Sequence, residues 1–189
     1  MTTIKAIETL YKSTRFRSRT EARWAVFFDS AGLRWQYEPE GYDLGEGVWY
    51  LPDFFLPDID LFVEIKPPLL PDNGWPPTEA FEKMCGLQRL LTGEEPWPTK
   101  IVMLCGSPGP PSIYGFYDEH RPYEGFIVGD AGHYWCECKG CGAIGVQFEG
   151  RAGRNRHKTT CLFKHDRDEI NLDSLKLLTA YEAACSARF

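Results

Sequence analysis

Hydrophobic and polar residues alternate with the period of a strand between Leu61 and Lys66, where the chain reads Leu-Phe-Val-Glu-Ile-Lys. Successive side chains of a strand point to opposite faces, so Phe62, Glu64 and Lys66 share one face and the apolar residues between them share the other. The pattern predicts a strand with an acid and an amine on the same side. A strand with one solvated face is the simpler reading of these residues.

Apolar residues recur at helical spacing in three other segments. Residues 20–31 predict a helix with Thr20 or Ser18 at its N-cap, and residues 78–91 predict a second amphipathic helix after Thr78. The second helix would present the stripe Phe81, Met84, Leu87, Leu90 and Leu91. A C-terminal helix is expected after Asn171 or Asp173, with Leu172, Leu175, Leu178 and Tyr181 as its apolar stripe.

Further strands are predicted on both sides of the second helix. Val48–Leu56 is an extended run that would form a hairpin with the Leu61–Lys66 strand through a connection at residues 57–60. Lys100–Cys105 is apolar throughout, as in a central buried strand, and Ile113–Tyr117 can return beside it. Helices and strands therefore alternate, which predicts an α/β fold.

The predicted hairpin would bring Asp53 beside Glu64. Two carboxylates that converge on one point suit Mg²⁺ or Mn²⁺ better than zinc. Such a metal polarises a phosphate oxygen and lowers the pKa of a bound water, and an adjacent ammonium such as that of Lys66 can orient the nucleophile. These groups together predict a hydrolytic site for phosphodiesters.

The stretch Pro52-Asp53, followed by Glu64-Ile65-Lys66, resembles the motif of the PD-(D/E)xK nuclease superfamily, over roughly residues 15–115. The resemblance implies a restriction-endonuclease-like fold, with a mixed central sheet flanked by helices. It implies that Asp53 and Glu64 bind the catalytic metal and that Lys66 assists the attacking water. In this superfamily an acid on the first helix often completes the site, and here Glu21 is the acid in that position. Its alternative role is to stabilise the positive end of the helix.

The second helix of the superfamily frequently supplies a Gln or a Lys near the metal. Gln88 and Lys83 are the residues of those types here, and we take Gln88 as the supporting member, because an exposed solubilising role suits Lys83. The expected catalytic set is Asp53, Glu64, Lys66, Glu21 and Gln88.

A group of Cys and His residues near the C-terminus predicts a second metal site. Cys138-x2-Cys141 followed by Gly142 has the spacing of a metal knuckle, and His157-x3-Cys161 completes four ligands for tetrahedral zinc. Four protein ligands close such a site, so a structural role is expected rather than a catalytic one. Cys136 could replace one Cys, and His165 could replace His157.

The cysteine-rich segment resembles a zinc ribbon or a small treble-clef-like finger. We therefore divide the chain into a nuclease-like domain at residues 1–131, a zinc-binding module at 132–168 and a C-terminal helix at 169–189. The C-terminal helix could pack on the nuclease-like domain or form a dimer contact.

Charge is distributed unevenly along a chain whose formal net charge is −6. Residues 1–35 carry seven basic and three acidic residues, residues 36–131 carry five and seventeen, and residues 132–168 carry seven and four. Two basic segments flanking an acidic centre suit a phosphate backbone held across a metal site, although each could be a solvated surface. The nucleic-acid-binding residues expected from them are Arg15, Arg17, Arg19, Arg151, Arg154, Arg156 and Lys158.

Composition limits the remaining possibilities. With 189 residues and 43% hydrophobic content the chain can bury one sizeable core and a small appendage. No membrane-spanning stretch or signal-peptide pattern is present, and seven cysteines, four of them at metal spacing, favour a reducing compartment, so a cytoplasmic location is expected.

These observations predict a Mg²⁺- or Mn²⁺-dependent deoxyribonuclease, an endonuclease in our interpretation, whose zinc module helps to bind or position DNA. Nucleases of this size with zinc appendages resemble phage, mobile-element or host-defence proteins. The alternative is a non-catalytic module on a nuclease-like scaffold that binds nucleic acid or a protein partner, since a fold does not guarantee its chemistry. A third possibility is a zinc enzyme in which Cys161 is not a ligand. A homodimer is compatible with all three.

Overall fold

The computed structural model of the chain describes residues 6–67, 78–93, 100–109, 113–115, 133–148 and 170–189. Its helices are α1 (Arg19–Ala31), α2 (Thr78–Thr92) and α3 (Leu175–Ser186). Its strands are β1 (Thr9–Tyr11), β2 (Thr14–Phe16), β3 (Gln36–Tyr37), β4 (Tyr42–Asp43), β5 (Trp49–Tyr50), β6 (Phe54–Leu56), β7 (Leu61–Lys66), β8 (Ile101–Cys105), β9 (Ile113–Gly115), β10 (His133–Cys138), β11 (Ile144–Phe148) and β12 (Ile170–Asn171). The arrangement is mixed α/β, as the sequence predicts.

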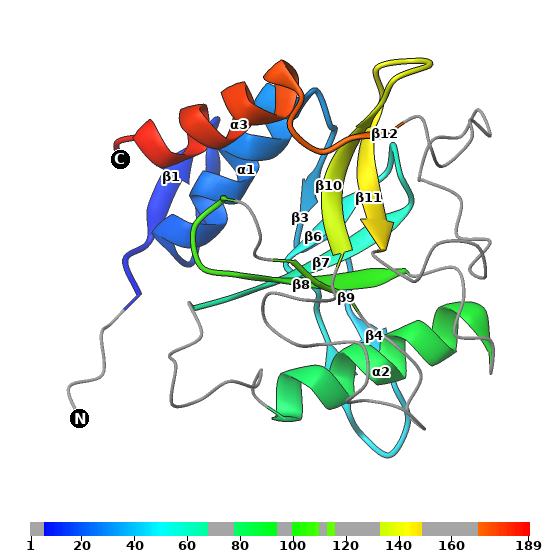
Figure 1. The fold of residues 1–189 in the computed structure, drawn as a ribbon. Helices are drawn as coiled ribbons and strands as arrows, with labels where there is room; N and C mark the ends of the chain where they lie inside the picture. Colours follow the sequence, from blue (N-terminus) through cyan, green and yellow to red (C-terminus); the bar gives the residue numbers. More distant parts are fainter. Residues whose placement is uncertain (1–5, 68–77, 94–99, 110–112, 116–132, 149–169) are drawn as a thin grey trace.

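A five-stranded sheet with the order β3-β6-β7-β8-β9 lies at the centre of the described chain. Strands β6 and β7 form the predicted antiparallel hairpin, and β7 and β8 are parallel. Parallel neighbours require a crossover connection, and α2 lies in the connection between these two strands (Figure 1). The sheet is therefore mixed, and its two central strands come from the segments with the most apolar residues.

Alternation along β7 sends its side chains into two separate cores. Leu61, Val63 and Ile65 pack in the cluster that includes α1, whereas Phe62 packs in the cluster beneath α2. Glu64 is on the α2 side of the sheet because it is two residues after Phe62. The shared face predicted from the sequence is confirmed.

Helix α1 begins and ends at residues that suit its two ends. The Ser18 hydroxyl accepts a hydrogen bond from the Glu21 N–H, and Gly32 adopts a left-handed conformation with φ of 73° at the C-terminal end. The inner face contributes Trp24 and Phe28, which are fully buried. Burial of each such side chain contributes about 1.5–3 kcal/mol, so the helix is held mainly by its packing on the sheet.

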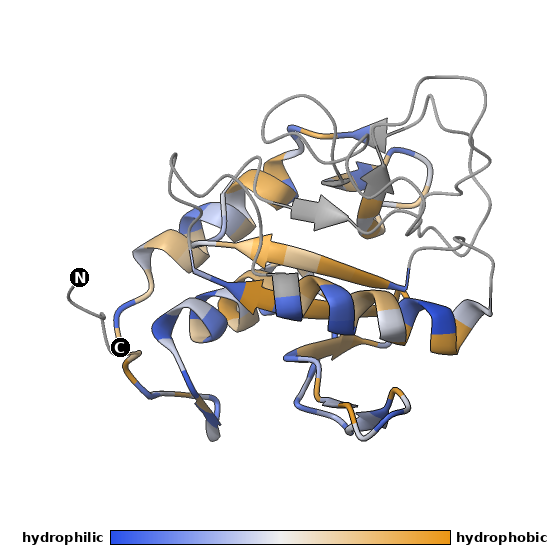
Figure 2. Ribbon diagram, turned by 90° about the horizontal axis from the view of Figure 1, so that it is seen from below, coloured by the Kyte–Doolittle hydropathy of each residue, from blue (hydrophilic) through white to orange (hydrophobic). Residues whose placement is uncertain are grey.

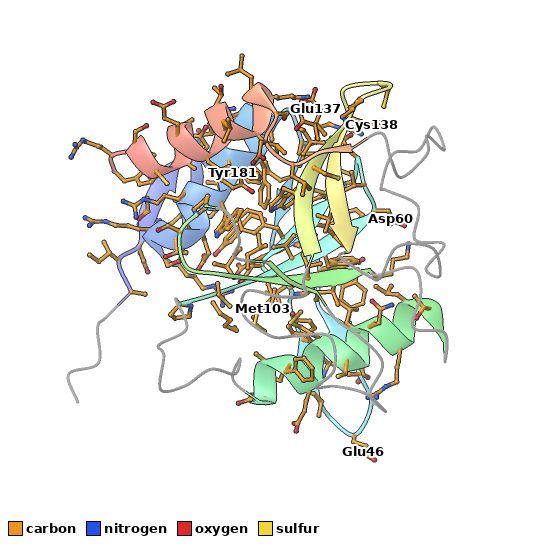
Figure 3. All side chains as sticks on the ribbon, viewed as in Figure 1. Glu46, Asp60, Met103, Glu137, Cys138 and Tyr181 are labelled. Carbon is orange, nitrogen blue, oxygen red and sulfur yellow. The ribbon has the colours of Figure 1, made fainter. Side chains whose placement is uncertain are left out.

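Helix α2 covers the opposite face of the sheet (Figure 1). Met84 and Leu87 are buried against the sheet, and Met103 of β8 points toward the helix (Figure 3). Hydrophobic and hydrophilic residues alternate along α2, as the colouring in Figure 2 shows. The predicted stripe is right in its centre but wrong for Leu90 and Leu91, which are exposed beyond the part of the helix that contacts the sheet.

The hairpin β10–β11 and helix α3 pack on the α1 side of the sheet (Figure 1). The Trp135 ring lies 5.3 Å from that of Phe27, and the ring of Tyr181 in α3, which Figure 3 labels, lies 4.9 Å from Phe27. Trp135, Leu177 and α1 thus belong to one hydrophobic cluster. Of the two alternatives left open by the sequence, packing of the C-terminal helix on the rest of the chain is the one seen in the described residues.

The cap of helix α3 lies one residue after the nearer of the two predicted positions, and the predicted apolar face of the helix is wrong except at Tyr181, which packs against the core. Ser174 caps the helix by accepting the Leu177 N–H, and the buried positions are Leu177, Ala180 and Ala184. Leu175, a member of the predicted stripe, is 81% exposed. The helix turns its small side chains toward α1, which a count of large apolar residues does not reveal. None of the described helices is long and apolar enough to cross a membrane.

Candidate metal-dependent active site

The register of the β6–β7 hairpin brings two acids together. Phe54 pairs with Val63, so one residue further along the same register Asp53 is opposite Glu64. Residues directly opposite on antiparallel strands share a face of the sheet. Both acids are almost inaccessible, at 4% and 5% exposure respectively. The structure therefore brings together the two acids that the sequence predicts to converge.

Asp53 is held by one neutral and one charged donor. Its Oδ2 accepts a 2.7 Å hydrogen bond from the Ile65 backbone N–H of β7, and its Oδ1 lies 2.6 Å from Nη2 of Arg17. The same guanidinium nitrogen lies 2.9 Å from Glu38 Oε1. The backbone bond fixes the carboxylate on β7, whereas the charged bond comes from an Arg17 side chain that is largely exposed.

Glu64 has a matching pair of contacts. The Tyr50 hydroxyl donates a 2.7 Å hydrogen bond to Oε2, and the Lys66 ammonium pairs with Oε1. Lys66 is two residues further along the same face of β7, and its side chain is 24% exposed. Each carboxylate thus has one oxygen fixed by a neutral group and one paired with a cationic side chain.

Glu21 is buried at the start of α1, where it bonds to several groups. Its Oε1 accepts from the Ser18 hydroxyl at 2.7 Å, and its Oε2 accepts from the Tyr37 hydroxyl at 2.6 Å and from the Arg17 N–H at 3.0 Å. Burial and the bond to Glu21 raise the pKa of Tyr37, so its proton stays in place. Glu21 therefore stabilises the beginning of the helix, and it also lies near Asp53.

The buried acids leave the site short of positive charge. Burial raises the pKa of Asp53 to about 7, with further contributions from the negative charges of Glu64 and Glu21. The Ile65 N–H and Arg17 lower this pKa but do not offset the rise. A carboxylate that resists ionisation near neutral pH would be stabilised by a further cation beside it.

The donor chemistry of Asp53 and Glu64 fits a hard divalent cation. Mg²⁺ is commonly bound by one or two carboxylates, with waters and substrate phosphates as the other ligands. Among the residues that the structure describes, no group of three or more His, Cys, Asp or Glu side chains is arranged to hold a metal. Asp53 and Glu64 are the residues that would hold Mg²⁺ or Mn²⁺ here.

The structure places Gln88 away from these acids. Its Oε1 accepts a 2.8 Å hydrogen bond from the Lys100 N–H, at the start of β8. Lys66 pairs with Cys105 at the other end of that strand. Lys83 pairs with Glu79 at 2.8 Å, and the pKa of Glu79 is lowered by Lys83 first and also by Lys66. The first turn of α2, rather than Gln88, is therefore the part of the helix near the site.

The arginines predicted to bind nucleic acid occupy different surroundings. Arg15 is exposed and pairs with Glu8 at 3.3 Å, Arg17 contacts Asp53, and Arg19 is exposed at the first position of α1. Arg17 is thus part of the candidate site. The remaining predicted residues of this kind, Arg151, Arg154, Arg156 and Lys158, lie outside the described residues.

The first half of the predicted zinc site is a turn between two strands. Cys138 ends β10, and its carbonyl accepts a 2.7 Å hydrogen bond from the Gly142 N–H, with Gly142 at φ of 69°. Glycine suits this left-handed position because it has no Cβ. Cys138 and Cys136 are buried and Cys141 is exposed. His157, Cys161 and His165 lie outside the described residues, so the ligand set stays a prediction.

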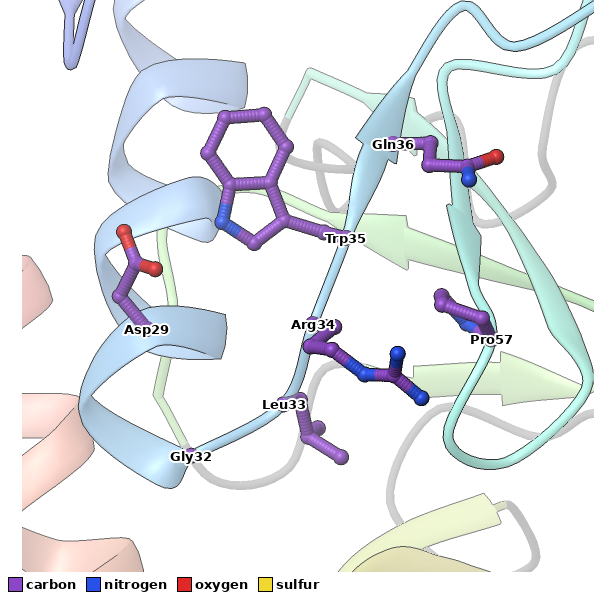
Figure 4. A pocket seen from close by; sticks show the side chains of 7 residues that line it. All are labelled: Asp29, Gly32, Leu33, Arg34, Trp35, Gln36 and Pro57. Carbon is purple, nitrogen blue, oxygen red and sulfur yellow. The ribbon is translucent and has the colours of Figure 1, made fainter.

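A hollow of about 530 Å³ lies between the end of α1 and the β6–β7 turn (Figure 4). Its lining includes Trp35, Pro57 and Arg34, and the Arg34 guanidinium pairs with Asp58 at 2.6 Å. Pro57 follows β6, whereas Asp53 precedes it. The hollow is therefore at the opposite end of the strand from the two acids and is separate from the candidate site.

Sequence reasoning missed the two tyrosines that hold the acids. Tyr50 and Tyr37 lie on short strands that come before Asp53 in the chain. Nothing in their local sequence marks them as partners of Glu64 and Glu21, because both contacts depend on where these strands lie in the folded chain. Comparison with protein families, curated proteins and solved structures finds no match for this chain.

Proposed function

We propose that this protein is a Mg²⁺- or Mn²⁺-dependent nuclease that hydrolyses phosphodiester bonds in DNA. The proposal rests on one observation: Asp53 and Glu64 are buried opposite each other on neighbouring strands, with Lys66 on the same face as Glu64. A buried acid with a raised pKa and a nearby cation, as at Asp53, is typical of functional sites. A hydrolytic metal site explains why the fold buries this much negative charge.

Each residue has a distinct role in this proposal. Asp53 and Glu64 would hold the metal, which would lower the pKa of a bound water and neutralise charge on the phosphate. The Lys66 ammonium would orient the attacking water and stabilise negative charge that develops on the phosphate oxygens. Tyr50 and the Ile65 N–H would keep the two carboxylates in place, because each fixes one carboxylate oxygen.

Arg17 and Glu21 would support the site from the start of α1. Arg17 places a cation next to Asp53, and its largely exposed guanidinium is suited to contact a phosphate of the substrate. Glu21 adds negative charge near Asp53. Its carboxylate also accepts a hydrogen bond from the Arg17 backbone N–H, which positions this part of the backbone.

The order of elements also supports the proposal. Helix α1, strands β3, β6 and β7, helix α2 and strand β8 follow one another, with β8 parallel to β7. This is the order that the resemblance to the PD-(D/E)xK superfamily implies. The β10–β11 turn with Cys138 and Cys141 would then belong to a zinc module that helps to position the DNA.

The test is cleavage of supercoiled plasmid and of end-labelled oligonucleotides in Mg²⁺ or Mn²⁺. We expect Asp53→Asn, Glu64→Gln and Lys66→Met each to lower the rate by about 100-fold or more. Asp58→Asn and Lys100→Met are matched controls, because Asp58 pairs with Arg34 and Lys100 with Asp60, at the other end of the hairpin. Nicking of closed plasmid would show endonuclease action.

A non-catalytic binding module is the second candidate. It is favoured by the contacts of Asp53 and Glu64, since the four carboxylate oxygens already have partners within the protein. Such a module would bind DNA or a protein without cutting, and it would have no need for Mn²⁺ at Asp53. Absence of metal-dependent cleavage by the folded wild-type protein on every DNA tested would reject the nuclease in favour of this module.

A further inference from the structure

Three arginines and an aromatic ring surround a second hollow, of about 240 Å³, between α1 and the end of α3. Its lining consists of Arg19, Arg23, Ala187, Arg188 and Phe189. Arg19 and Arg23 are four residues apart on α1, so they lie on the same side of that helix. Arg188 comes from the far end of the sequence and is placed here because α3 packs along α1 (Figure 1).

The three guanidinium groups lack acidic partners in the described part of the chain. No Asp or Glu there forms an ion pair with Arg19, Arg23 or Arg188, whereas Arg15 and Arg34 each pair with one acid and Arg17 pairs with two. The Arg23 Nε is in addition buried without a hydrogen-bond acceptor among the described residues. Clustered cations repel one another, so an anion bound among them would stabilise the cluster.

Both walls of the hollow are attached to the turn that follows β8. Arg23 Nη1 donates a 3.3 Å hydrogen bond to the Ser107 hydroxyl, and the Cys185 thiol of α3 donates to the Pro108 carbonyl at 3.1 Å. Gly106, at the start of this turn, donates its N–H to the Lys66 carbonyl at 2.9 Å. The arginines are therefore connected through a few residues to the end of β7 that carries Lys66.

We propose that this hollow, which we call the arginine pocket, binds one backbone phosphate of the DNA strand that enters the active site. This inference rests on the proposed nuclease function. Small-molecule sites usually measure about 300–1,000 Å³, so the arginine pocket suits a single phosphodiester rather than a cofactor. Planar guanidinium groups match phosphate oxygens in pairs, which lysines do not.

Phe189 adds an apolar wall to the arginine pocket. Its ring is 41% exposed and lies 6.2 Å from that of Tyr11 in an edge-to-face contact, which holds it in place. Sugars and bases stack on aromatic rings of this kind with little sequence preference. The arginine pocket thus combines anion binding with a surface for the neighbouring nucleoside, a combination that fits a nucleic acid strand better than a free anion.

The test measures binding of a short fluorescein-labelled DNA duplex and of its single strand by fluorescence anisotropy in Ca²⁺. Every protein in the comparison carries Asp53→Asn, so that no cleavage is required. The test variant is Arg19→Gln with Arg188→Gln, both at exposed positions. The control, Arg34→Gln with Arg89→Gln, removes the same net charge from other surfaces.

We expect the test variant to bind at least one of the two DNAs about tenfold more weakly than the control, because charge-assisted hydrogen bonds are lost. The slope of its log affinity against log salt concentration should also be shallower, by the amount expected for the loss of about one phosphate contact. Equal affinity and equal salt dependence of the test and control variants would overturn the proposal that the arginine pocket binds a DNA phosphate.

Inorganic phosphate at constant ionic strength distinguishes the two sources of the anion. If the test variant loses its response to inorganic phosphate, followed by NMR, but binds DNA like the control, the hollow is a free-phosphate site and the proposal is wrong. Failure of the nuclease proposal would be seen separately. If the wild-type protein does not cut DNA but its DNA binding depends on Arg19 and Arg188, the nuclease proposal is wrong and the proposed phosphate binding by the arginine pocket is supported.

Discussion

The hydroxyl of Tyr50 donates a 2.7 Å hydrogen bond to Oε2 of Glu64, and both residues are buried on the side of the sheet that faces α2. Burial, together with the negative charge of Glu64, raises the pKa of Tyr50 well above its ordinary value. The hydroxyl therefore stays protonated and remains a donor. Its role is to hold Glu64 in one orientation.

Replacing Tyr50 with Phe should lower the free energy of unfolding by about 1–3 kcal/mol, because a buried carboxylate oxygen loses its donor while the ring still packs. Tyr42→Phe is the matched control, since its hydroxyl bonds to the exposed Glu40. That variant should differ from wild type by less than about 0.5 kcal/mol. Chemical denaturation measures both, and equal effects would show that the Tyr50 bond contributes nothing specific.

The raised pKa of Asp53 predicts a pH dependence of stability. The folded state holds this proton up to about pH 7, whereas the ordinary value is 3.8, so the folded state binds more protons between these values. Stability without metal should therefore fall as pH rises through this window, by up to about 4 kcal/mol. The measurement is the difference in unfolding free energy between wild type and Asp53→Asn at each pH.

That difference removes the contributions of titrating groups remote from Asp53, because those groups behave alike in both proteins. Added Mg²⁺ should reverse the loss in the wild type near pH 7, since a cation favours the ionised carboxylate. A difference that stays constant between pH 4 and pH 7 would contradict the predicted titration.

Gln88→Met should lower stability without changing the chemistry. The Lys100 N–H at the start of β8 would lose its acceptor, which costs about 1–3 kcal/mol. The cleavage rate of the folded enzyme should stay within about threefold of wild type, well below the 100-fold or greater loss expected for a catalytic acid or base. Both are measured on one preparation; a large loss of rate with unchanged stability would return Gln88 to the catalytic set.

The turn that carries Cys138 and Cys141 predicts a bound zinc ion in the protein. Cys138→Ala and Cys161→Ala should each lose this zinc, measured by mass spectrometry, and should unfold at lower temperature, because a structural metal contributes directly to folding. Cys185→Ala is the control, because its thiol bonds to the Pro108 carbonyl. Zinc retained in Cys161→Ala would show that another residue, such as Cys136 or His165, completes the site.

Local sequence patterns are enough to predict the central strands of the sheet. The alternation in β7, the short connection to β6 and the uninterrupted apolar run of β8 each occur within a few residues, and each depends on backbone geometry that adjacent residues determine. The opposition of Asp53 and Glu64 follows from the same register. Patterns were less useful for α3, because its contact face is set by the close approach of α1 rather than by its largest side chains.

Hairpin register and side-chain alternation are local properties, so residues close together in the sequence are enough to predict the two acids, the lysine beside them and the strands that carry them. The contacts of Tyr50 with Glu64, of Arg17 with Asp53 and of Gln88 with the start of β8 depend instead on the packing of distant segments, as does the meeting of Arg188 with Arg19. These contacts join segments between 12 and 169 residues apart, and they form only when separate elements pack around a common core. No periodicity along the chain encodes such a meeting.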